Sequence, residues 1–369
     1  MKILFLTSSL GSGGAERVAS TLANAWAARG DQVTLLPTFS GGGKPFYRFN
    51  ESVELLHLTH LSSIAPRSGK QYLRRLMALR RLVNERKPDV VVSFLPNVNI
   101  AALLATAFAG VPCVVCERSD PTQQQLELKW RLACKLLYRL ADSVVVQTES
   151  VAQSIGMLYG GLRKVAVIPN PIPVELMRWQ AGANAMAQRR VLLSMGRLVE
   201  VKQVHHIISA FSCLHEGYPE WDLHIYGDGP LAKQLLRQIE RAGLTERVFL
   251  KGNTSEPWAV MAQADAFVMA SAYEGFPNAL LEAMAVGLPC VATDCRSGPR
   301  ELSRDGTDAL LVKPNDKIDL RNAMHRLISG AALRGHLGAK ARQSVQARYS
   351  LPSVLAAWDE LFSAIGVRR

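Results

Sequence analysis

Short apolar runs alternate with amphipathic stretches along most of the chain. In the first half, seven runs have the length and β-branched content of buried strands: Ile3–Thr7, Gln32–Leu36, Val53–His57, Val90–Phe94, Cys113–Cys116, Ser143–Gln147 and Val165–Ile168. Near-continuous apolar strands separated by helices are typical of parallel sheets that helices cover on both faces. The pattern therefore predicts an α/β fold.

A proline-rich segment interrupts this alternation near the middle of the chain. Three prolines fall within residues 169–173, which neither a helix interior nor a central strand accommodates. Six further strands are predicted after it: Val191–Met195, Leu223–Tyr226, Val248–Leu250, Ala266–Ala270, Pro289–Thr293 and Ala309–Val312. We predict two tandem doubly wound, Rossmann-like parallel-sheet domains, residues 1–169 and 170–350, and a terminal helix, Leu351–Ile365, within residues 351–369.

The predicted topology also indicates where ligands bind. Doubly wound sheets bind their ligands beyond the carboxyl ends of the strands. If these edges of the two domains face each other, the cleft between the domains is the expected site. Motifs that directly follow a predicted strand are therefore the candidates for chemistry.

The start of the chain and its cysteines favour a cytoplasmic protein. The first predicted strand begins two residues after Met1, without the longer apolar run of a secretory signal. In a reducing compartment the six cysteines are expected to stay unpaired. Cys113 and Cys116 have the spacing of half a zinc site, but they lie within a predicted strand and lack a second pair. We expect core thiols there and no metal site. The uncharged segment Val90–Cys116 is interrupted by prolines, so we expect buried α/β core and not a membrane span.

The net charge of +12 is concentrated in the first half of the chain, where residues 1–169 carry +9. A solvated basic surface explains this simply. The alternative is an acidic partner for the first domain, either a phosphorylated substrate, an anionic membrane or a nucleic acid.

The first candidate motif, Gly11–Arg17, follows the first strand and opens a helix. Gly13 and Gly14 would let backbone N–H groups and the helix N-terminus approach a phosphate. Glu16 stands where a dinucleotide fingerprint needs its last glycine, and no Walker lysine follows. A turn that needs glycine only for its backbone remains the alternative.

The second candidate motif, Gly196–Lys202, follows the strand Val191–Met195 and is expected to open the next helix. Arg197 and Lys202 are five positions apart and can converge on a diphosphate, the arginine as a planar fork and the lysine as a point charge.

The third candidate motif, Glu274–Glu282, contains two carboxylates around a turn and a helix start. Carboxylates suit the paired hydroxyls of a ribose or a sugar ring. The N–H groups of Asn278, Ala279 and Leu280 would point at a phosphate. A glutamate that complements the helix dipole accounts for one carboxylate, but not for Glu282 on an apolar helix, where an unpaired charge is costly.

Taken in order, these motifs resemble those of glycosyltransferase family 4, and the resemblance covers most of the chain. The family implies the GT-B fold, transfer with retention at the anomeric carbon, and a terminal helix that crosses back to the first domain. It also implies independence of metal, with the nucleotide sugar as the co-substrate and no other cofactor.

The resemblance implies a role for each motif residue. Arg197 and Lys202 would bind the donor diphosphate and stabilise charge on the leaving nucleoside diphosphate. Glu274 would contact the hydroxyls of the donor sugar, and Glu282 would hold the nucleotide ribose. Gly13 and Gly14 would let the first loop close over the phosphates. In the family, retention is usually ascribed to front-face attack, so no covalent nucleophile is expected.

One position departs from the family pattern. Members often have a histidine after the strand that here ends at Cys116, where it reaches the donor sugar. Arg118 occupies that place, preceded by Glu117 as in relatives that build bacterial surface glycans. We expect Arg118 to contact sugar or phosphate, or to form an ion pair.

Two predicted basic amphipathic helices, Tyr72–Arg86 and Leu128–Leu140, bear on the acceptor, and the loop Ala65–Lys70 adds two cations. Such helices lie on anionic lipid or grip a pyrophosphate, although a solvated basic face is the alternative. We predict a polyprenyl-diphosphate-linked glycan acceptor at the inner face of the cell membrane, and a UDP-N-acetylhexosamine donor. UDP-glucose, UDP-galactose and GDP-sugars remain open.

Three other protein classes share some of these features. A nicotinamide-dependent dehydrogenase lacks its fingerprint here. A nonhydrolysing UDP-sugar epimerase shares the GT-B fold and stays an alternative, although the paired cations and glutamates favour transfer. A nucleic-acid-binding protein would explain the charge but not the glutamates, and aromatic residues do not interleave the basic runs. We expect no nucleic-acid partner.

Overall fold

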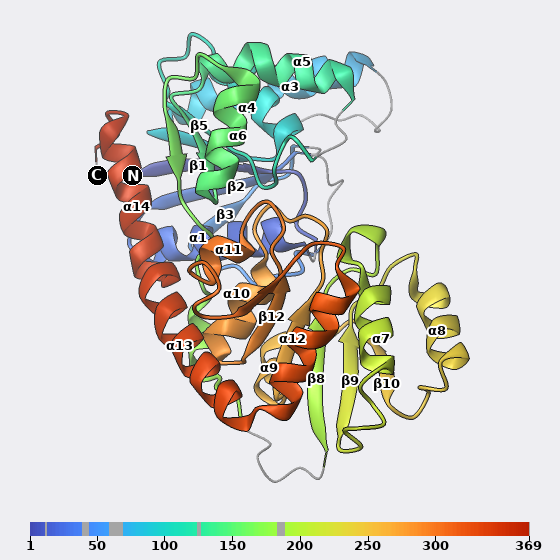
Figure 1. Cartoon of the computed structure of the whole chain (residues 1–369). Coiled ribbons are helices and arrows are strands. Elements are labelled where there is room, and N and C mark those ends of the chain that lie inside the picture. The colour runs from blue at the N-terminus through green and yellow to red at the C-terminus, as the bar shows by residue number, and fades with distance from the viewer. Residues whose placement is uncertain (12, 39–43, 59–68, 124–126, 183–188, 369) are drawn as a thin grey trace. The chain divides into compact units, whose positions relative to one another are not determined.

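The computed structural model describes residues 1–369 except 12, 39–43, 59–68, 124–126, 183–188 and 369. The chain divides into two compact units (Figure 1). The first consists of Met1–Pro171 together with Val354–Arg369, and the second of Ile172–Ser353. Each unit has its own sheet and core.

The sheet of the first unit is fully parallel. Its strands are β1 (Lys2–Thr7), β2 (Gln32–Pro37), β3 (Val53–Leu55), β4 (Val90–Phe94), β5 (Cys113–Cys116), β6 (Ser143–Val146) and β7 (Val165–Val167). They lie in the order β3-β2-β1-β4-β5-β6-β7, and neighbouring strands pair in parallel register. Each strand overlaps a run predicted from the apolar pattern.

Helices cover both faces of this sheet. One face packs against α3 (Gly69–Arg86), α4 (Pro96–Thr106), α5 (Leu128–Leu137) and α6 (Glu149–Tyr159), through a cluster that contains Leu4, Val91 and Val115. On the other face, Phe5 contacts both Phe94 and Trp26 of α1 (Gly14–Ala28). Trp26 in turn contacts Trp358 of α14 (Leu351–Ala364), with ring centroids 5.5 Å apart. The terminal helix thus completes the core of the first unit.

The second unit repeats this plan with six strands. They are β8 (Arg190–Met195), β9 (Trp221–Tyr226), β10 (Val248–Gly252), β11 (Ala266–Met269), β12 (Cys290–Thr293) and β13 (Leu310–Val312), in the order β10-β9-β8-β11-β12-β13 and again parallel. One face packs against α7 (Val204–Ser212), α8 (Ala232–Arg241) and α12 (Lys317–Ser329). The other packs against α9 (Pro257–Ala262), α10 (Asn278–Val286) and α13 (Ala331–Tyr349).

Both strand orders confirm the predicted doubly wound fold. In such a sheet the crevice for ligands opens where the order reverses, between adjacent strands whose connections lead to opposite sides. Here that point lies between β1 and β4 in the first unit and between β8 and β11 in the second. The three candidate motifs follow β1, β8 and β11.

Two further features of the structure bear on membrane spanning. The segment Val90–Cys116 folds as β4, α4 and β5, as predicted. Among the described residues, no helix is both long enough and apolar enough to span a bilayer.

Candidate active site

The loop after β8 carries the two predicted cations and is not continuous with the following helix. Lys202 ends a short 3-10 turn, Glu200–Lys202, and Gln203 then adopts a left-handed conformation with φ 47° before α7 begins at Val204. The prediction of one uninterrupted helix from this motif was wrong, because the left-handed residue breaks the helix after Lys202. Lys202 therefore lies on a loop at the sheet edge, and Arg197 is exposed beside it.

The loop after β9 holds this cationic loop in place. The N–H of Gly196 donates to the Tyr226 carbonyl oxygen (3.0 Å), and the N–H of Leu198 donates to the Asp228 carbonyl oxygen (2.8 Å). A β-carbon on Gly227, whose φ is +135°, would lie 1.9 Å from the carbonyl oxygen of Gly196. Only glycine permits this approach at Gly227.

A second glycine, Gly229, is required for the same reason. A β-carbon added at this position would lie 2.4 Å from the carbonyl oxygen of Leu198. Sequence reasoning missed both glycines, although a Gly-x-Gly directly after a predicted strand is a signal that could have identified them.

Lys202 and Glu274 come together in the structure. Lys202 Nζ lies 2.5 Å from Glu274 Oε1, and the two side chains are 25% and 10% exposed. The N–H of Ala272 donates to the Val201 carbonyl oxygen (2.8 Å), which joins the two loops. The Ser297 hydroxyl donates to the backbone carbonyl of Glu274. Lys202, the predicted diphosphate-binding cation, and Glu274, the predicted sugar-binding acid, thus form an ion pair.

Glu282 lies in α10, one turn after Asn278, and only 3% of its surface is exposed. The indole Nε1 of the half-buried Trp258, near the start of α9, donates to Glu282 Oε2 (3.2 Å). A buried carboxylate is stabilised by such a donor. The sequence alone did not indicate Trp258, because 24 residues separate it from Glu282.

The start of α10 provides fewer amides than predicted. The N–H of Asn278 donates to the Phe276 carbonyl oxygen (3.0 Å), while Leu281 bonds back to Pro277 (3.0 Å). Ala279 and Leu280 belong to the first turn, where a helix supplies no carbonyl partner of its own. Their N–H groups are the amides suited to an anion, together with the positive end of the helix dipole.

In the first unit, the carboxylate of Glu16 lies against the loop that contains Gly13 and Gly14. Gly13 caps α1, and a β-carbon there would lie 2.1 Å from Oε2 of Glu16. The hydroxyl of Ser9 donates to Oε1 of Glu16 (2.7 Å). Glu16 therefore complements the positive end of α1. Since a carboxylate repels a phosphate, this geometry suits uncharged hydroxyl groups, and closure of Gly13 and Gly14 over phosphates stays a prediction.

Arg118 follows β5 and makes contacts with uncharged groups. Its guanidinium lies over the ring of Phe94, with 4.2 Å from Cζ to the centroid, and donates to Oδ1 of Asn170. Among the contacts of the described residues it has no carboxylate partner, so the ion pair considered from the sequence is not formed there. Burial lowers the pKa of Arg118 to about 10, and the group stays charged at neutral pH.

Glu117, next to Arg118, is fully buried on the α4 and α5 side of the sheet. The Tyr138 hydroxyl donates to Glu117 Oε1, and Asn99 Nδ2 donates to the Tyr138 hydroxyl (3.0 Å). Burial raises the pKa of Glu117 to about 7, although the hydrogen bond from Tyr138 opposes this shift. The sequence did not indicate that this glutamate is a core residue.

Metal ligands were not expected, and the described residues contain no group of three or more His, Cys, Asp or Glu side chains arranged to hold a metal ion. Cys113 and Cys116 are buried in β5, where burial raises the pKa of both thiols. They are core thiols, as predicted. Independence of metal during the reaction stays a prediction.

The two halves of the chain match two family models in succession. Residues 12–176 match the model described as Glycosyltransferase Family 4, and residues 178–344 match that of glycosyl transferases group 1. An exopolysaccharide phosphotransferase of Streptomyces coelicolor is 31% identical over 395 residues, which cover 100% of this chain and 41% of that protein. The chain thus spans less than half of that relative.

A relative of similar length comes from Campylobacter jejuni. It is named GalNAc-α-(1→4)-GalNAc-α-(1→3)-diNAcBac-PP-undecaprenol α-1,4-N-acetyl-D-galactosaminyltransferase, and it is 25% identical over 374 residues that cover 99% of both chains. Among solved structures, Anabaena HepE in complex with UDP superposes with a TM-score of 0.81 at 21% identity over 99% of this chain and 100% of that one. Sucrose-phosphate synthase from Thermosynechococcus elongatus superposes with a TM-score of 0.84 at 18% identity over 99% of both chains. These structures share the GT-B architecture.

Proposed function

Because the chain belongs to glycosyltransferase family 4, we propose that it transfers a sugar from a UDP-linked donor to a lipid-linked glycan, with retention at the anomeric carbon. The observation that carries this proposal is the Lys202–Glu274 ion pair beside the start of α10, with Glu282 one turn further along the helix. It combines a cation, free amides and two carboxylates at the ligand-binding edge of one sheet.

In this proposal, the second unit binds the donor. Lys202 and Arg197 meet the diphosphate, together with the N–H groups of Ala279 and Leu280. As the bond to the sugar breaks, negative charge grows on the leaving UDP, and these fixed charges and dipoles stabilise it without reorganisation. No metal is needed for that role.

The two carboxylates hold the uncharged parts of the donor. The diphosphate competes with Glu274 for Lys202, so donor binding frees Glu274 to accept hydrogen bonds from the sugar hydroxyls. Glu282, held by Trp258, accepts hydrogen bonds from the ribose hydroxyls. We propose no covalent nucleophile. The acceptor would attack the sugar from the same face from which the leaving group departs.

The identities of donor and acceptor rest on the relatives. HepE was solved with UDP, which supports a UDP-sugar. The Campylobacter relative transfers N-acetylgalactosamine to an undecaprenyl-diphosphate glycan that ends in GalNAc, by its name. We propose an N-acetylhexosamine donor and a polyprenyl-diphosphate-linked acceptor of this kind. Arg118 and the glycine loop with Gly13 and Gly14 would contact these substrates from the first unit.

We also propose that α3 and α5 bind the anionic inner surface of the cell membrane. Exposed apolar residues recur every fourth position on α5 and the turn after it, where Leu128, Leu132, Leu136 and Leu140 are 48–68% exposed. Lys129 and Lys135 lie beside them on the exposed side. Such a face combines apolar burial with electrostatic attraction to anionic lipid.

On α3, the exposed residues Leu73 and Met77 continue the apolar pattern, and Arg74, Arg80 and Arg81 are exposed as well. Arg75 differs from these arginines because it is half-buried and lines a pocket. The cations Arg67 and Lys70 of the predicted basic loop lie outside the described residues and side chains.

The experiment measures nucleoside-diphosphate release in EDTA from a panel of UDP-, GDP- and ADP-sugars, with and without an undecaprenyl-diphosphate glycan. Acceptor-dependent UDP release from one donor is expected. Lys202→Ala should lower that rate about a hundred- to a thousand-fold, as loss of one charge-stabilising donor does. Lys233→Ala, an exposed lysine on α8, is the matched control. Full activity of Lys202→Ala would contradict the site, and absence of any UDP release or binding would contradict the function.

A further inference from the structure

Buried polar side chains gather around the carboxyl end of β5, directly before Arg118. Glu117, Asn99 and Gln147 are 0–2% exposed and come from the end of β5, from α4 and from the position after β6. Tyr138, also fully buried, begins the turn after α5. We call these four residues the β5 cluster. Because burying a polar group is costly unless it is hydrogen-bonded, their partners indicate what they do.

Two amide side chains of the β5 cluster fix the peptide groups on either side of Glu117. Asn99 Nδ2 donates to the Cys116 carbonyl oxygen (3.1 Å), and Gln147 Nε2 donates to the Glu117 carbonyl oxygen. The carbonyl of Glu117 and the N–H of Arg118 belong to one planar peptide group. The bond from Gln147 therefore sets the orientation of the peptide from which Arg118 begins.

A chain of hydrogen bonds holds Asn99 and Glu117 in turn. The Ser93 hydroxyl donates to Asn99 Oδ1 (2.8 Å), and Asn99 Nδ2 donates to the Tyr138 hydroxyl (3.0 Å). The Tyr138 hydroxyl donates to Glu117 Oε1. These bonds tie β4, α4 and the turn after α5 to the end of β5. Buried networks of this kind fix geometry, and their members act together.

Arg118 depends on this anchoring because no ion pair holds it. Among the contacts of the described residues, its guanidinium meets the ring of Phe94 and Oδ1 of Asn170, which are both uncharged. Phe94 ends β4, and ligands of doubly wound sheets bind where the strand order reverses, here between β1 and β4. A shift of the peptide before Arg118 would therefore displace a cation at the ligand-binding edge.

We propose that Asn99, Tyr138 and Gln147 are positioning residues for the transfer reaction. They hold the peptide between Glu117 and Arg118, so that the Arg118 guanidinium meets the substrate in a fixed place. A fixed charge acts without reorganisation, and misplacing a group by about 1 Å lowers a rate by up to about a hundred-fold. This inference rests on the proposed function, in which Arg118 contacts the substrates from the first unit.

Single variants give the first part of the test, with kcat/KM of acceptor-dependent UDP release as the readout. Arg118→Ala should lower kcat/KM roughly ten- to a hundred-fold, the effect of losing one hydrogen bond from a charged group. Gln147→Met keeps the length of the side chain but removes its donor, and should lower kcat/KM about tenfold. Tyr138→Phe is a second variant of the β5 cluster and should act in the same direction, so the test stands even where Gln147→Met does not fold.

The double variant shows whether Gln147 acts through Arg118. Once Arg118 is replaced by Ala, nothing is left to position, so adding Gln147→Met should cause no further loss. The kcat/KM of the double variant should then equal that of Arg118→Ala within about threefold, whereas independent effects would multiply.

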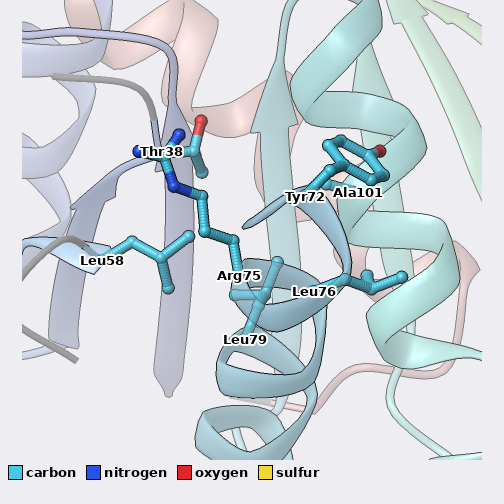
Figure 2. A pocket seen from close by; sticks show the side chains of 7 residues that line it. All are labelled: Thr38, Leu58, Tyr72, Arg75, Leu76, Leu79 and Ala101. Atoms are coloured by element: carbon cyan, nitrogen blue, oxygen red, sulfur yellow. The ribbon is translucent and has the colours of Figure 1, made fainter. Parts of the chain in front are cut away.

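Two controls separate positioning from a general loss of stability. Arg75 is another half-buried arginine of the first unit, and it extends from α3 towards Thr38, directly after β2, where both line a small pocket (Figure 2). The effects of Arg75→Ala and Gln147→Met should multiply, because the two sites are independent. Thr106→Val removes a buried hydroxyl that donates to the Ala102 carbonyl oxygen (2.9 Å) at the other end of α4. It should lower stability but not kcat/KM.

The outcomes separate this proposal from the proposed function. Full activity of Arg118→Ala, or losses that multiply in its double variant with Gln147→Met, would overturn the positioning role while transfer itself stands. If the wild type releases no UDP with any donor and acceptor, the proposed function fails. NMR of isotope-labelled protein then tests positioning through the Nε–Hε signal of Arg118, which is identified by its loss in Arg118→Lys. A shift of this signal in Gln147→Met and Tyr138→Phe, but not in Thr106→Val, supports the role, and an unchanged signal overturns it.

Discussion

Glu117 and Glu282 are both buried, yet their surroundings differ. Glu282 receives a hydrogen bond from Trp258 at the ligand-binding edge of the second unit. Glu117 lies in the core of the first unit, where Oε1 receives the Tyr138 hydroxyl and Oε2 has no partner among the described residues. The first arrangement gives the Glu282 carboxylate a fixed orientation. The second favours the protonated acid, because a buried charge needs more partners than this one has.

Replacing Trp258 with Phe should weaken donor binding more than it slows turnover. The phenyl ring keeps part of the apolar contact, but it is smaller than the indole, and Glu282 loses its N–H donor. A hydrogen bond to a charged group contributes about 1.5–3 kcal/mol, so the Kd of UDP should rise roughly ten- to a hundred-fold. Calorimetric titration with UDP and steady-state kinetics measure this. Trp179→Phe is the control, and an unchanged Kd would show that Trp258 does not position Glu282.

Glu117 should make the stability of the first unit depend on pH. Its pKa is about 7 when folded and 4.5 ordinarily, so between these values the folded state holds a proton that the unfolded state has released. Its contribution to stability is therefore fully present below pH 4.5 and is lost as the pH rises towards 7, by about 3 kcal/mol.

Urea denaturation at pH 5 and 7.5 measures this effect. The free energy of unfolding should fall more steeply with pH in the wild type than in Glu117→Gln, which does not titrate. Glu127→Gln, at an exposed glutamate, should follow the wild type. Parallel pH profiles for the wild type and Glu117→Gln would refute the prediction.

At the scale of elements, the loops after the strands owe their positions to neighbouring loops. The cationic loop after β8 is bonded to the loop after β9 and to the loop after β11. The close approach at Gly227 is possible only without a β-carbon. The helices, by contrast, differ in their outward faces: α3 and α5 expose leucine and methionine beside cations, a composition suited to a lipid surface.

Replacing Leu132 and Leu136 with Gln should weaken binding to vesicles that contain phosphatidylglycerol. Burying a leucine contributes about 1.5–3 kcal/mol, so loss of two should lower vesicle affinity at least tenfold. Sedimentation with the vesicles measures the effect. The matched control replaces Leu236 of α8 and Ile318 of α12, two exposed apolar residues of the second unit.

The exposed cations of α3 should act in the same assay. Replacing three arginines with Gln, at Arg74, Arg80 and Arg81, should weaken binding to these vesicles and reduce the dependence of binding on salt. Each basic residue near an anionic surface contributes about 1 kcal/mol. Arg75 is kept, because it is half-buried and lines a pocket. Unchanged vesicle binding in both variants would leave α3 and α5 as solvated faces.

At the scale of the whole molecule, the chain returns to its first unit at the end. Trp358 and Phe362 of α14 are almost fully buried and contact Trp26 of α1. Arg29 and Asp359 form an ion pair across the same two helices at 2.5 Å. A segment more than 300 positions away in sequence therefore completes the core of the first unit.

Replacing Trp358 with Ala should destabilise the first unit selectively. Removing a buried tryptophan costs about 3–5 kcal/mol. Hydrogen exchange should accelerate in β1 and β4, while UDP binding, proposed for the second unit, should keep its Kd. Glu360→Ala, at an exposed position of the same helix, is the control. Equal exchange in β1 and β4 of both variants would contradict this role of α14.

The order of strands and helices could be read from the sequence by itself. Each of the predicted strands overlaps an observed one, because buried parallel strands need continuous apolar runs and helices need a longer period. Placing Arg197, Lys202 and Glu274 in the loops after strands, and Glu282 in the helix that follows, was possible for the same reason. The connection rules of parallel sheets then bring those ends to one edge.

Only the tertiary structure decided which side chains meet at that edge. The bond from Trp258 to Glu282, the approach of Gly227 to Gly196 and the contact of Arg118 with Phe94 each join residues that lie 24 or more positions apart. The same holds for the unsatisfied hydroxyl of Tyr72, which depends on every group around it. Periodicity records whether a residue faces the core or solvent; it carries no information about the partner that packing brings from another element.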